Sequence, residues 1–408
     1  MSKPKHYDVV IVGGGAAGIA VASSILKRAP RLHLAIVDPA DKHFYQPGWT
    51  MVGAGIFDPV STGRPTSSVI PKGATWIKQA VQSFEPEGSR VMLADDSYLD
   101  YDRMVVCPGL KLNWDGVEGL VDSLGSNGVT SNYSYKTAPY TWESVQNLKS
   151  GRALFTQPPM PIKCAGAPQK AMYLSSDYWY RQGLINQIDV QFYTSTPGLF
   201  GVAAYVPALM KYVEKYGADL NFQHTLTKVD GANKVATFTD SEGAIVESEF
   251  DMIHVCPPQC APDFIRESAL ADEAGWVDVD QNTLQSTRFE NVWSLGDVMN
   301  APNAKTAAAA RAQAPVVAIN LLHHAGKMPN LCHYDGYGSC PLTVEKGKIV
   351  LAEFGYGGML KPSFPKFIID GEQPSHLAWL LKAKVLPWIY WEAMLKGREW
   401  MTNPIHVV

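Results

Sequence analysis

The first residues in the chain with a recognisable chemical use are glycines at fixed spacing. Gly13, Gly15 and Gly18 form a G-x-G-x-x-G pattern, and Asp38 follows twenty residues after the last of them. In this pattern the first glycine allows a tight turn, the second lets the backbone approach a pyrophosphate, and the third lets a helix pack closely on a strand. A carboxylate at the position of Asp38 accepts hydrogen bonds from ribose hydroxyls. The spacing predicts a dinucleotide site, for FAD or NAD(P), rather than an ordinary glycine-rich turn.

A second group of residues decides between these two cofactors. A short apolar stretch ends in Gly296 and Asp297, and Lys305 and Thr306 then open an alanine-rich helical pattern. An acid at this place can hold the ribityl hydroxyls of FAD, and the N-terminus of the following helix can stabilise negative charge on a reduced isoalloxazine. Together with the N-terminal glycines, the Gly-Asp pair favours FAD over NAD. We therefore assign these four residues to FAD binding.

Cysteines supply the candidate nucleophiles. Cys164 directly precedes a predicted helix that begins near Gln169, and a helix N-terminus lowers the pKa of a thiol and makes it a better nucleophile. Lys163 and Lys170 are placed to add positive charge beside it. Cys340 lies much later in the chain, in a glycine-rich loop. Spacing alone does not bring the two cysteines together, and any single cysteine is more readily an inert buried residue.

The remaining four cysteines show no metal-binding pattern. Cys256 and Cys260 stand four residues apart around two prolines, no C-x-x-C spacing occurs, and no second pair completes a zinc site. We expect no metal ion. In a long chain that we expect in the cytoplasm, we also expect no structural disulfide framework. Cys107, Cys256, Cys260 and Cys332 are interpreted as structural.

Two α/β units are expected to position these residues. The strand patterns of the first unit cover residues 7–12, 32–37, 74–84, 90–93 and 101–107. The patterns of the second unit are strands at residues 152–157, 188–193, 225–249 and 251–256, with helices from about residues 169 and 202. In the second unit, the first strand-to-helix turn holds three prolines and Cys164 where a nucleotide site would have G-x-G-x-x-G. The loss of that fingerprint argues against NAD(P)H as the electron donor.

The predicted fold class is α/β, with two Rossmann-like domains and a C-terminal amphipathic region for membrane association. We place an FAD-binding domain at residues 1–110 and 277–330. A vestigial NAD-type domain carrying Cys164 covers residues 111–276, and the region carrying Cys340 covers residues 331–408.

The C-terminal region is aromatic and cationic. Four of the eleven tryptophans lie after residue 374, among cations that include Lys382 and Lys384, and Pro387 is expected to divide this stretch into two short helices. Tryptophan and lysine at helix flanks favour the headgroup region of a membrane. An ordinary docking helix or a homodimer contact is the alternative interpretation.

Composition argues against several other classes. The net charge of −4 gives no reason to expect a nucleic-acid partner. The sequence contains no run of about 18 apolar residues, so no membrane-spanning helix is expected. The N-terminus runs straight into the first strand without an apolar secretory segment.

Longer blocks of the chain resemble sulfide:quinone oxidoreductases, in particular the type that includes the animal mitochondrial enzyme. These blocks occur in order over nearly the full length: HFYQP (43–47), PIKCAGAPQK (161–170), AGWVDVD (274–280), KTAAA (305–309), YDGYGSCPL (334–342) and LPWIYW (386–391). Many other family types use three cysteines, whereas this type is understood to use two, which Cys164 and Cys340 match. The resemblance also implies that Gln46 contacts FAD.

The resemblance implies oxidation of hydrogen sulfide with quinone as the electron acceptor. In the resting enzyme Cys164 and Cys340 are expected to be bridged, directly or through an extra sulfur. Hydrosulfide attacks the Cys340 sulfur and frees the Cys164 thiolate, which donates to flavin C4a. A nucleophilic acceptor (sulfite, glutathione or another thiol) removes the sulfane sulfur, and FADH2 passes two electrons to quinone.

The resemblance further implies a peripheral membrane protein, which we expect at the bacterial inner membrane facing the cytoplasm. Quinone is expected to enter through the C-terminal helices, with Phe354 and Tyr356 as candidate aromatic walls of its site. A type II NADH:quinone oxidoreductase is the alternative function, but it needs a second glycine fingerprint and no paired cysteines. A flavin-retaining binding protein without turnover is a third hypothesis, which the intact candidate site residues argue against.

Overall fold

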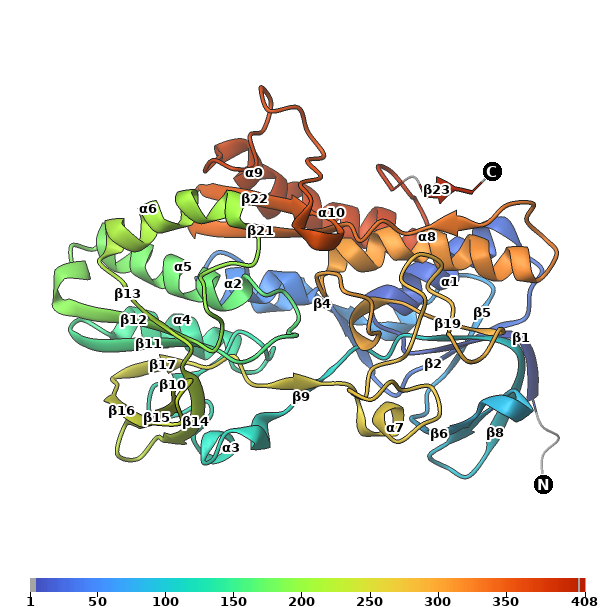
Figure 1. Ribbon diagram of the computed structural model, residues 1–408, viewed down its shortest axis with the longest axis horizontal. Coiled ribbons are helices and arrows are strands. Elements are labelled where there is room, and N and C mark those ends of the chain that lie inside the picture. The colour runs from blue at the N-terminus through green and yellow to red at the C-terminus, as the bar shows by residue number, and fades with distance from the viewer. Residues whose placement is uncertain (1–4, 403, 408) are drawn as a thin grey trace.

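The structure, a computed structural model, describes residues 5–402 and 404–407. Two lobes, each built on a largely parallel sheet, lie side by side (Figure 1). The sheet of the first lobe has the order β5-β2-β1-β8-β7-β6, and β19 pairs with β8 outside this path. Its strands are β1 (Lys5–Val12), β2 (Leu34–Val37), β5 (Ala74–Ile77), β6 (Val81–Glu85), β7 (Arg90–Leu93), β8 (Tyr98–Val106) and β19 (Val292–Ser294).

The central strands of the first lobe are apolar where they run through its core. Residues 9–12 of β1 and all four residues of β2 are buried, as expected for parallel strands that are covered on both faces. Helix α1 (Ala16–Arg28) packs against α8 (Ala307–His324), and both contribute to the core of this lobe. This packing fixes the glycine-rich turn at the carboxyl end of β1.

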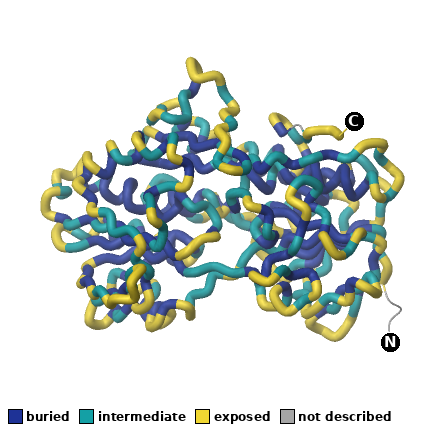
Figure 2. Tube along the Cα trace, in the orientation of Figure 1, coloured by how far each residue is buried: buried dark blue, intermediate teal, exposed yellow. Residues whose placement is uncertain are grey.

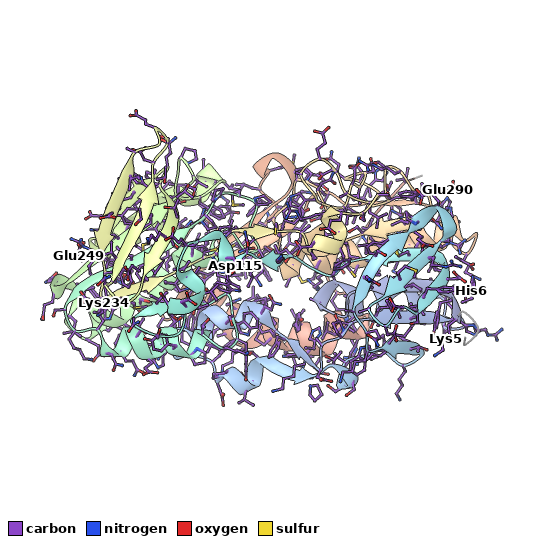
Figure 3. The ribbon with its side chains drawn as sticks, turned by 90° about the horizontal axis from the view of Figure 1, so that it is seen from below. Lys5, His6, Asp115, Lys234, Glu249 and Glu290 are labelled. Atoms are coloured by element: carbon purple, nitrogen blue, oxygen red, sulfur yellow. The ribbon has the colours of Figure 1, made fainter. Side chains whose placement is uncertain are left out.

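The second lobe carries a five-stranded parallel sheet of order β10-β17-β11-β12-β13. These strands are β10 (Val129–Thr130), β11 (Gly151–Gln157), β12 (Ile188–Thr194), β13 (Asp219–Phe222) and β17 (Met252–His254). Helices α4 (Ala138–Asn147), α5 (Ala167–Arg181) and α6 (Val206–Tyr216) share a core with one face. The antiparallel strands β14 (Thr225–Asp230), β15 (Val235–Thr239) and β16 (Ile245–Glu249) form a separate small sheet, which contributes to a further core. Seen from below, Lys234 and Glu249 of this lobe lie far from His6 and Glu290 of the first (Figure 3).

The residues after 331 are shared between the two lobes. Strands β21 (Gly338–Glu345) and β22 (Lys348–Phe354) form a hairpin that packs on α5 within the core of the second lobe. Tyr390, Trp391 and neighbouring residues instead join the core of the first lobe. Figure 2 shows the resulting buried interior in both lobes. The C-terminal chain therefore ties the lobes together and brings Cys340, on β21, to α5.

Pro387 does not divide the C-terminal helix, so that prediction is wrong. The chain runs through α9 (His376–Leu380), η10 (Leu381–Val385), α10 (Leu386–Trp388), η11 (Ile389–Ala393) and η12 (Met394–Lys396), and the backbone stays right-handed helical at each junction. A proline ring clashes with the carbonyl four residues earlier in a regular α-helix. Here η10 is a π turn, and its wider radius accommodates the proline. We call residues 376–396 the C-terminal helical segment.

The single strand pattern at residues 74–84 becomes two strands. β5 pairs parallel with β2 at one edge of the sheet, whereas β6 pairs antiparallel with β7 at the other edge. Within the part of the chain that the structure describes, no helix has both the length and the apolar character needed to cross a membrane.

Candidate active site

The glycine-rich turn lies between β1 and α1 and has the geometry of a phosphate cradle. Gly13 has a φ of +106°, and a Cβ there would lie 2.5 Å from the Cys107 oxygen, while a Cβ on Gly18 would lie 1.8 Å from the Gly13 oxygen. Both positions therefore require glycine. A Cβ on Gly15 would meet no described atom within 4 Å, and no described side chain caps the N-terminus of α1. The open backbone and the free N–H groups of the helix fit the pyrophosphate of a dinucleotide.

Asp38 braces this turn. Its Oδ2 accepts a hydrogen bond of 2.6 Å from the Gly14 N–H, and its Oδ1 accepts one of 2.8 Å from the Ala40 N–H. A carboxylate has lone pairs beyond these two bonds, so Asp38 is still able to accept ribose hydroxyls. That contact stays a prediction.

The Gly-Asp turn lies at the end of β19. Gly296 begins the short turn η8 (Gly296–Val298), and its N–H donates to Gln313 Oε1 at 2.8 Å. Burial raises the pKa of the half-buried Asp297, and the charge of Lys305 opposes that rise. Lys305 Nζ donates to the main-chain oxygen of Asp297 at 2.7 Å, which leaves the carboxylate available to ligand hydroxyls. The donor and acceptor set fits the ribityl chain of a flavin cofactor.

Lys305 and Thr306 connect that turn to α8. Thr306 Oγ1 accepts the Ala309 N–H at 3.1 Å and so caps the helix. The Lys305 main-chain oxygen accepts the Cys164 N–H at 2.8 Å. The predicted FAD-binding turn and the predicted cysteine turn are thus directly hydrogen-bonded to each other, although 140 residues separate them in sequence.

Cys164 lies in the loop between β11 and α5. Its φ of +52° places it in the left-handed region, which is unusual for a residue with a Cβ. Besides the bond to Lys305, its carbonyl accepts the Ala167 N–H at 2.7 Å, directly at the start of α5. These bonds hold the Cys164 backbone in its turn.

The structure brings the two candidate cysteines together. Cys164 Sγ and Cys340 Sγ are 3.6 Å apart. Cys340 sits on β21 opposite Ala352 and is buried, whereas Cys164 is half-buried. Gly166 makes this approach possible, because a Cβ there would lie 2.6 Å from Cys340 Sγ.

Two buried lysines determine the charge at the sulfur pair. Lys170 Nζ donates to Cys164 Sγ at 3.1 Å. The neighbouring Cys340 thiol, followed by the charges of Lys170 and Lys382, holds the pKa of Cys164 well below its ordinary value despite burial. The hydrogen bond with Cys164, burial and the Cys164 charge raise the pKa of Cys340. Cys164 is therefore the thiolate of the pair.

Lys382 is the site residue that the sequence interpretation missed. The sequence pattern groups Lys382 with cations at a membrane surface, but its side chain is 2% exposed and donates to the Pro47 oxygen at 3.1 Å. Burial and the charge of Lys170 lower its pKa to about 8. One feature of the sequence could have identified Lys382 as a site residue. It lies within an apolar and aromatic stretch, where a lysine is either at an interface or buried.

Lys163 and Gln46 contact each other instead of the sulfurs. Lys163 Nζ donates to Gln46 Oε1 at 2.7 Å and lies 5.7 Å from the centre of the Trp49 ring. Burial lowers the pKa of Lys163. Of the two lysines predicted to flank Cys164, it is therefore Lys170 that reaches the sulfur. A contact of Gln46 with the cofactor stays a prediction.

The other cysteines have different surroundings. Burial raises the pKa of Cys256 to about 12 and raises the pKa values of Cys107 and Cys332. Cys260 is half-buried on β18 (Gln259–Cys260), which pairs with β9 (Lys111–Leu112). No group of three or more potential metal ligands occurs among residues 5–402 and 404–407.

The side chains of Phe354 and Tyr356 pack against different parts of the structure. The Phe354 ring meets Phe200 edge-on, with centroids 6.0 Å apart, against the core of the second lobe. Tyr356 packs against Tyr334, and its hydroxyl donates to the Gln281 oxygen at 2.6 Å. Their role as walls of a quinone site stays a prediction.

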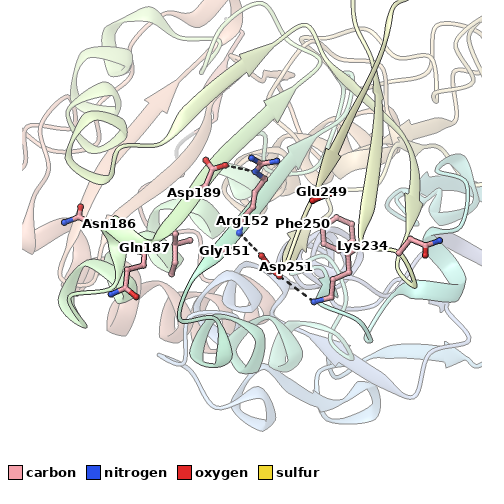
Figure 4. Close-up of a pocket in the computed structure, with 11 residues that line it drawn as sticks. Gly151, Arg152, Asn186, Gln187, Asp189, Lys234, Glu249, Phe250 and Asp251 are labelled. Carbon is pink, nitrogen blue, oxygen red and sulfur yellow. Dashed lines mark hydrogen bonds and ion pairs between the residues drawn. The ribbon is translucent and has the colours of Figure 1, made fainter.

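A polar surface cleft lies away from these residues, at the end of β11 opposite to Cys164 (Figure 4). Its Arg152 pairs with Asp189 at 2.6 Å, and its Lys234 pairs with Asp251 at 3.8 Å. Since the charges in each pair neutralise one another, the cleft offers little for a charged ligand. We therefore consider the cysteine pair, and not this cleft, as the candidate site of the chemistry.

Known proteins resemble this chain at two levels. A family model described as lycopene cyclase protein matches residues 8–56, which contain the glycine-rich turn and Asp38. A Dictyostelium discoideum protein named mitochondrial sulfide:quinone oxidoreductase is 44% identical over 400 residues, which cover 97% of this chain and 88% of that protein. The mouse protein of the same name is 38% identical over 394 residues, covering 96% of this chain and 87% of that protein.

A solved structure supports the fold. The sulfide:quinone oxidoreductase of Aquifex aeolicus superposes with a TM-score of 0.80 at 19% identity, covering 97% of this chain and 92% of that one. At this identity the match speaks for the architecture alone.

Proposed function

The chain belongs to the sulfide:quinone oxidoreductase family, and from that premise we propose how its own residues carry out the reaction. It is a flavin-dependent oxidoreductase whose substrates are sulfide and quinone. The comparisons give no support to the NADH:quinone alternative. The observation that carries the mechanism is the 3.6 Å approach of Cys164 and Cys340 beside Lys170.

We propose that the flavin is FAD. Its pyrophosphate would be held by the turn of Gly13, Gly15 and Gly18, and its adenosine ribose by Asp38. Its flavin end would be held by the segment that contains Gly296, Asp297, Lys305 and Thr306, and by Gln46. The support is the open backbone at Gly15 together with the free N-terminus of α1. When bound, FAD supplies a two-electron acceptor that connects sulfide to quinone.

Cys340 is the sulfur that hydrosulfide attacks in this proposal. Thiol–disulfide exchange is faster when the departing thiolate has a low pKa, and the environment lowers the pKa of Cys164 while it raises that of Cys340. In the attack, a new S–S bond forms on Cys340. The bond to Cys164 breaks, and its electron pair stays on Cys164 as a thiolate beside the Lys170 ammonium.

The sulfur pair also accommodates a bridge of three sulfurs. Two S–S bonds of about 2.05 Å, joined at a bent angle, reach about 3.3 Å, and the two Sγ atoms are 3.6 Å apart. After the attack by hydrosulfide, a nucleophilic acceptor takes the outer sulfur from Cys340 and leaves a thiolate there. When the bridge re-forms, the two cysteines lose two electrons, and a bound FAD would supply the acceptor for them.

We propose an anionic sulfur acceptor: sulfite, the thiolate of glutathione or another thiolate. Lys170 and Lys382 are both about 2% exposed and place two cationic side chains near the cysteines. Positive charge in a desolvated site favours an anion over a neutral nucleophile. This charge is the support for the choice of acceptor.

The visible spectrum of the purified flavoprotein tests the proposed function. Sulfide added without quinone is expected to bleach the flavin absorbance, with a long-wavelength charge-transfer band from the Cys164 thiolate, and quinone is expected to restore the colour. NADH is expected to cause no change. Bleaching by NADH and no response to sulfide would contradict the function.

We propose that the exposed apolar residues of the C-terminal region lie on a membrane surface, where quinone enters. Phe367 is 88% exposed, and Leu377, Leu380 and Trp388 are each between 44% and 51% exposed. The last three recur three and eight residues apart on the C-terminal helical segment, and Lys384 lies among them. Apolar and cationic residues on one helical face favour an anionic lipid surface.

The membrane proposal is tested by vesicle sedimentation. We expect the triple variant Leu377→Ser, Leu380→Ser, Trp388→Ser to lose roughly tenfold or more of its affinity for anionic phospholipid vesicles, because each serine removes buried apolar area. The matched control is Ile245→Ser, at a residue that is 72% exposed on β16 in the small sheet of the second lobe. Unchanged vesicle binding with a change from dimer to monomer would instead identify this face as a homodimer contact.

We further propose that this membrane is the bacterial inner membrane and that the protein faces the cytoplasm. The support is the sequence pattern, because the four cysteines outside the sulfur pair show no spacing of a structural disulfide framework, and the lack of such a framework is typical of chains that fold in a reducing compartment.

A further inference from the structure

The ammonium group of Lys305 is buried among two carbonyls and an aromatic ring. The side chain is 7% exposed, and Nζ donates to the main-chain oxygens of Asp297 at 2.7 Å and Met299 at 2.8 Å. The centre of the Trp276 ring lies 4.2 Å from the same Nζ. Two carbonyls and one indole face therefore surround a cation that is shielded from water. The nearby carboxylates are those of Asp297 and Asp272, and neither forms an ion pair with Lys305 in the part of the chain that the structure describes.

A buried cation without a direct carboxylate partner needs other compensation for its lost hydration. Carbonyl dipoles supply part of it, and the negative face of an aromatic ring supplies more, with tryptophan the most effective ring. Burial still lowers the pKa of Lys305 to about 8. The charge of Lys305 near neutral pH therefore depends on these few contacts and on the charges of Asp297 and Asp272, which raise its pKa.

Trp276 is held rigidly for this contact. Asp272 Oδ1 accepts the N–H groups of Ala274 and Trp276, each at 2.9 Å, and the Asp272 N–H donates to the Trp276 oxygen at 2.7 Å. Gly275, with a φ of +86°, closes this tight turn. Trp276 itself is 8% exposed.

The chain after Trp276 is bonded to the same segment that Lys305 contacts. The Val277 N–H donates to the Val298 oxygen at 3.0 Å, and the Asn300 N–H donates to the Val277 oxygen at 3.0 Å. Because these bonds flank Met299, the ring of Trp276 and the carbonyl acceptors of Lys305 belong to one hydrogen-bonded unit. The main-chain oxygen of Lys305 also accepts the Cys164 N–H.

We propose that Trp276 is a positioning residue whose indole face keeps Lys305 cationic at the junction of the Asp297 turn and the Cys164 turn. On the basis of the proposed function, we also infer that the fixed positive charge of Lys305 favours the reduced form of the bound flavin. The placement of Lys305 by Trp276 holds independently of the substrate.

The test compares Trp276→Phe and Trp276→Leu with the wild-type holo-protein. Phenylalanine keeps a weaker aromatic face, and leucine keeps only apolar bulk. We expect the labelling rate of the Lys305 amine by an amine-acylating reagent at pH 7, measured by mass spectrometry, to rise about threefold in W276F and about fivefold in W276L, because a pKa that falls by one unit from about 8 raises the neutral fraction of the amine at pH 7 about fivefold. Lys384, labelled in the same digest, is the internal control.

The flavin provides a second measurement. We expect the preference for reduced flavin to fall about tenfold in W276L, which corresponds to a midpoint potential lower by about 30 mV for a two-electron couple. An unchanged Lys305 labelling rate in W276L overturns the proposal, as does an unchanged potential. If W276L fails to fold, W276F decides alone, and an unchanged labelling rate there overturns it. If sulfide does not reduce the wild type, the proposed function fails, while the labelling result still tests the placement of Lys305.

Discussion

Cys164→Ser and Cys340→Ser are each expected to slow sulfide-dependent flavin reduction by about 1,000-fold or more, because residues that act as a chemical unit lose nearly all activity when one is removed. Neither variant can form a sulfur bridge, so hydrosulfide has no S–S bond to attack. The flavin is expected to stay bound, since neither side chain belongs to the glycine-rich turn or the Gly-Asp turn. Anaerobic stopped-flow absorbance after mixing with sulfide measures the rate.

The control for the cysteine variants is Cys260→Ser. Cys260 is also half-buried, but it lies on the short strand β18, which pairs with β9, whereas Cys340 lies on β21. We expect this variant to keep wild-type activity. Full activity in either Cys164→Ser or Cys340→Ser would contradict the mechanism, because the remaining thiol has no partner 3.6 Å away.

Lys170→Met is expected to move the pH dependence of Cys164 reactivity to higher pH. The neighbouring Cys340 thiol and then the Lys170 ammonium hold the pKa of Cys164 down, so loss of the ammonium raises that pKa. An opposite charge at this distance shifts a pKa by roughly one to three units, so the pH at which Cys164 is half ionised is expected to rise by roughly one to three units. Reactivity is expected to recover as the pH rises.

The rate of Cys164 alkylation by iodoacetamide in the reduced protein, followed by mass spectrometry from pH 5 to 10, measures this shift. Lys384→Met is the matched control, since Lys384 is an exposed lysine of the C-terminal helical segment and Lys382, two residues away, is buried. We expect the control to leave the profile in place. A Lys170→Met profile that coincides with the wild type would show that Lys170 does not set the thiolate.

Local sequence predicted the parts of the site that depend on local geometry. Gly13 and Gly18 are required because a Cβ at either position would meet backbone atoms at 2.5 Å or less, and such requirements leave a fixed spacing in the sequence. The same holds for Thr306, whose position as a helix cap follows from the residues next to it. The absence of a second G-x-G-x-x-G pattern could also be read from the sequence, because that pattern lies within a single turn.

Residue spacing did not show which distant residues meet: the pairing of Cys164 and Cys340 was implied only by the family resemblance, and the tertiary structure gives its physical reason. The Cys164 and Cys340 sulfurs belong to different elements, and they approach because β21 packs on α5 and Gly166 leaves room between them. Packing also decided that Lys382 is buried against Pro47 rather than exposed with Lys384. It likewise decided that residues 74–84 form two strands, because each half pairs with a different edge of the sheet.

The sequence by itself determined the cofactor turns of this protein, since glycine spacing, helix capping and the Gly-Asp turn act over a few residues. Only the tertiary structure decided the charge at the sulfur pair. The low pKa of Cys164 depends on Cys340, Lys170 and Lys382, and two of these three groups come from distant parts of the chain. Electrostatic energy depends on distance and burial in the folded state, and neither quantity can be read from residue spacing.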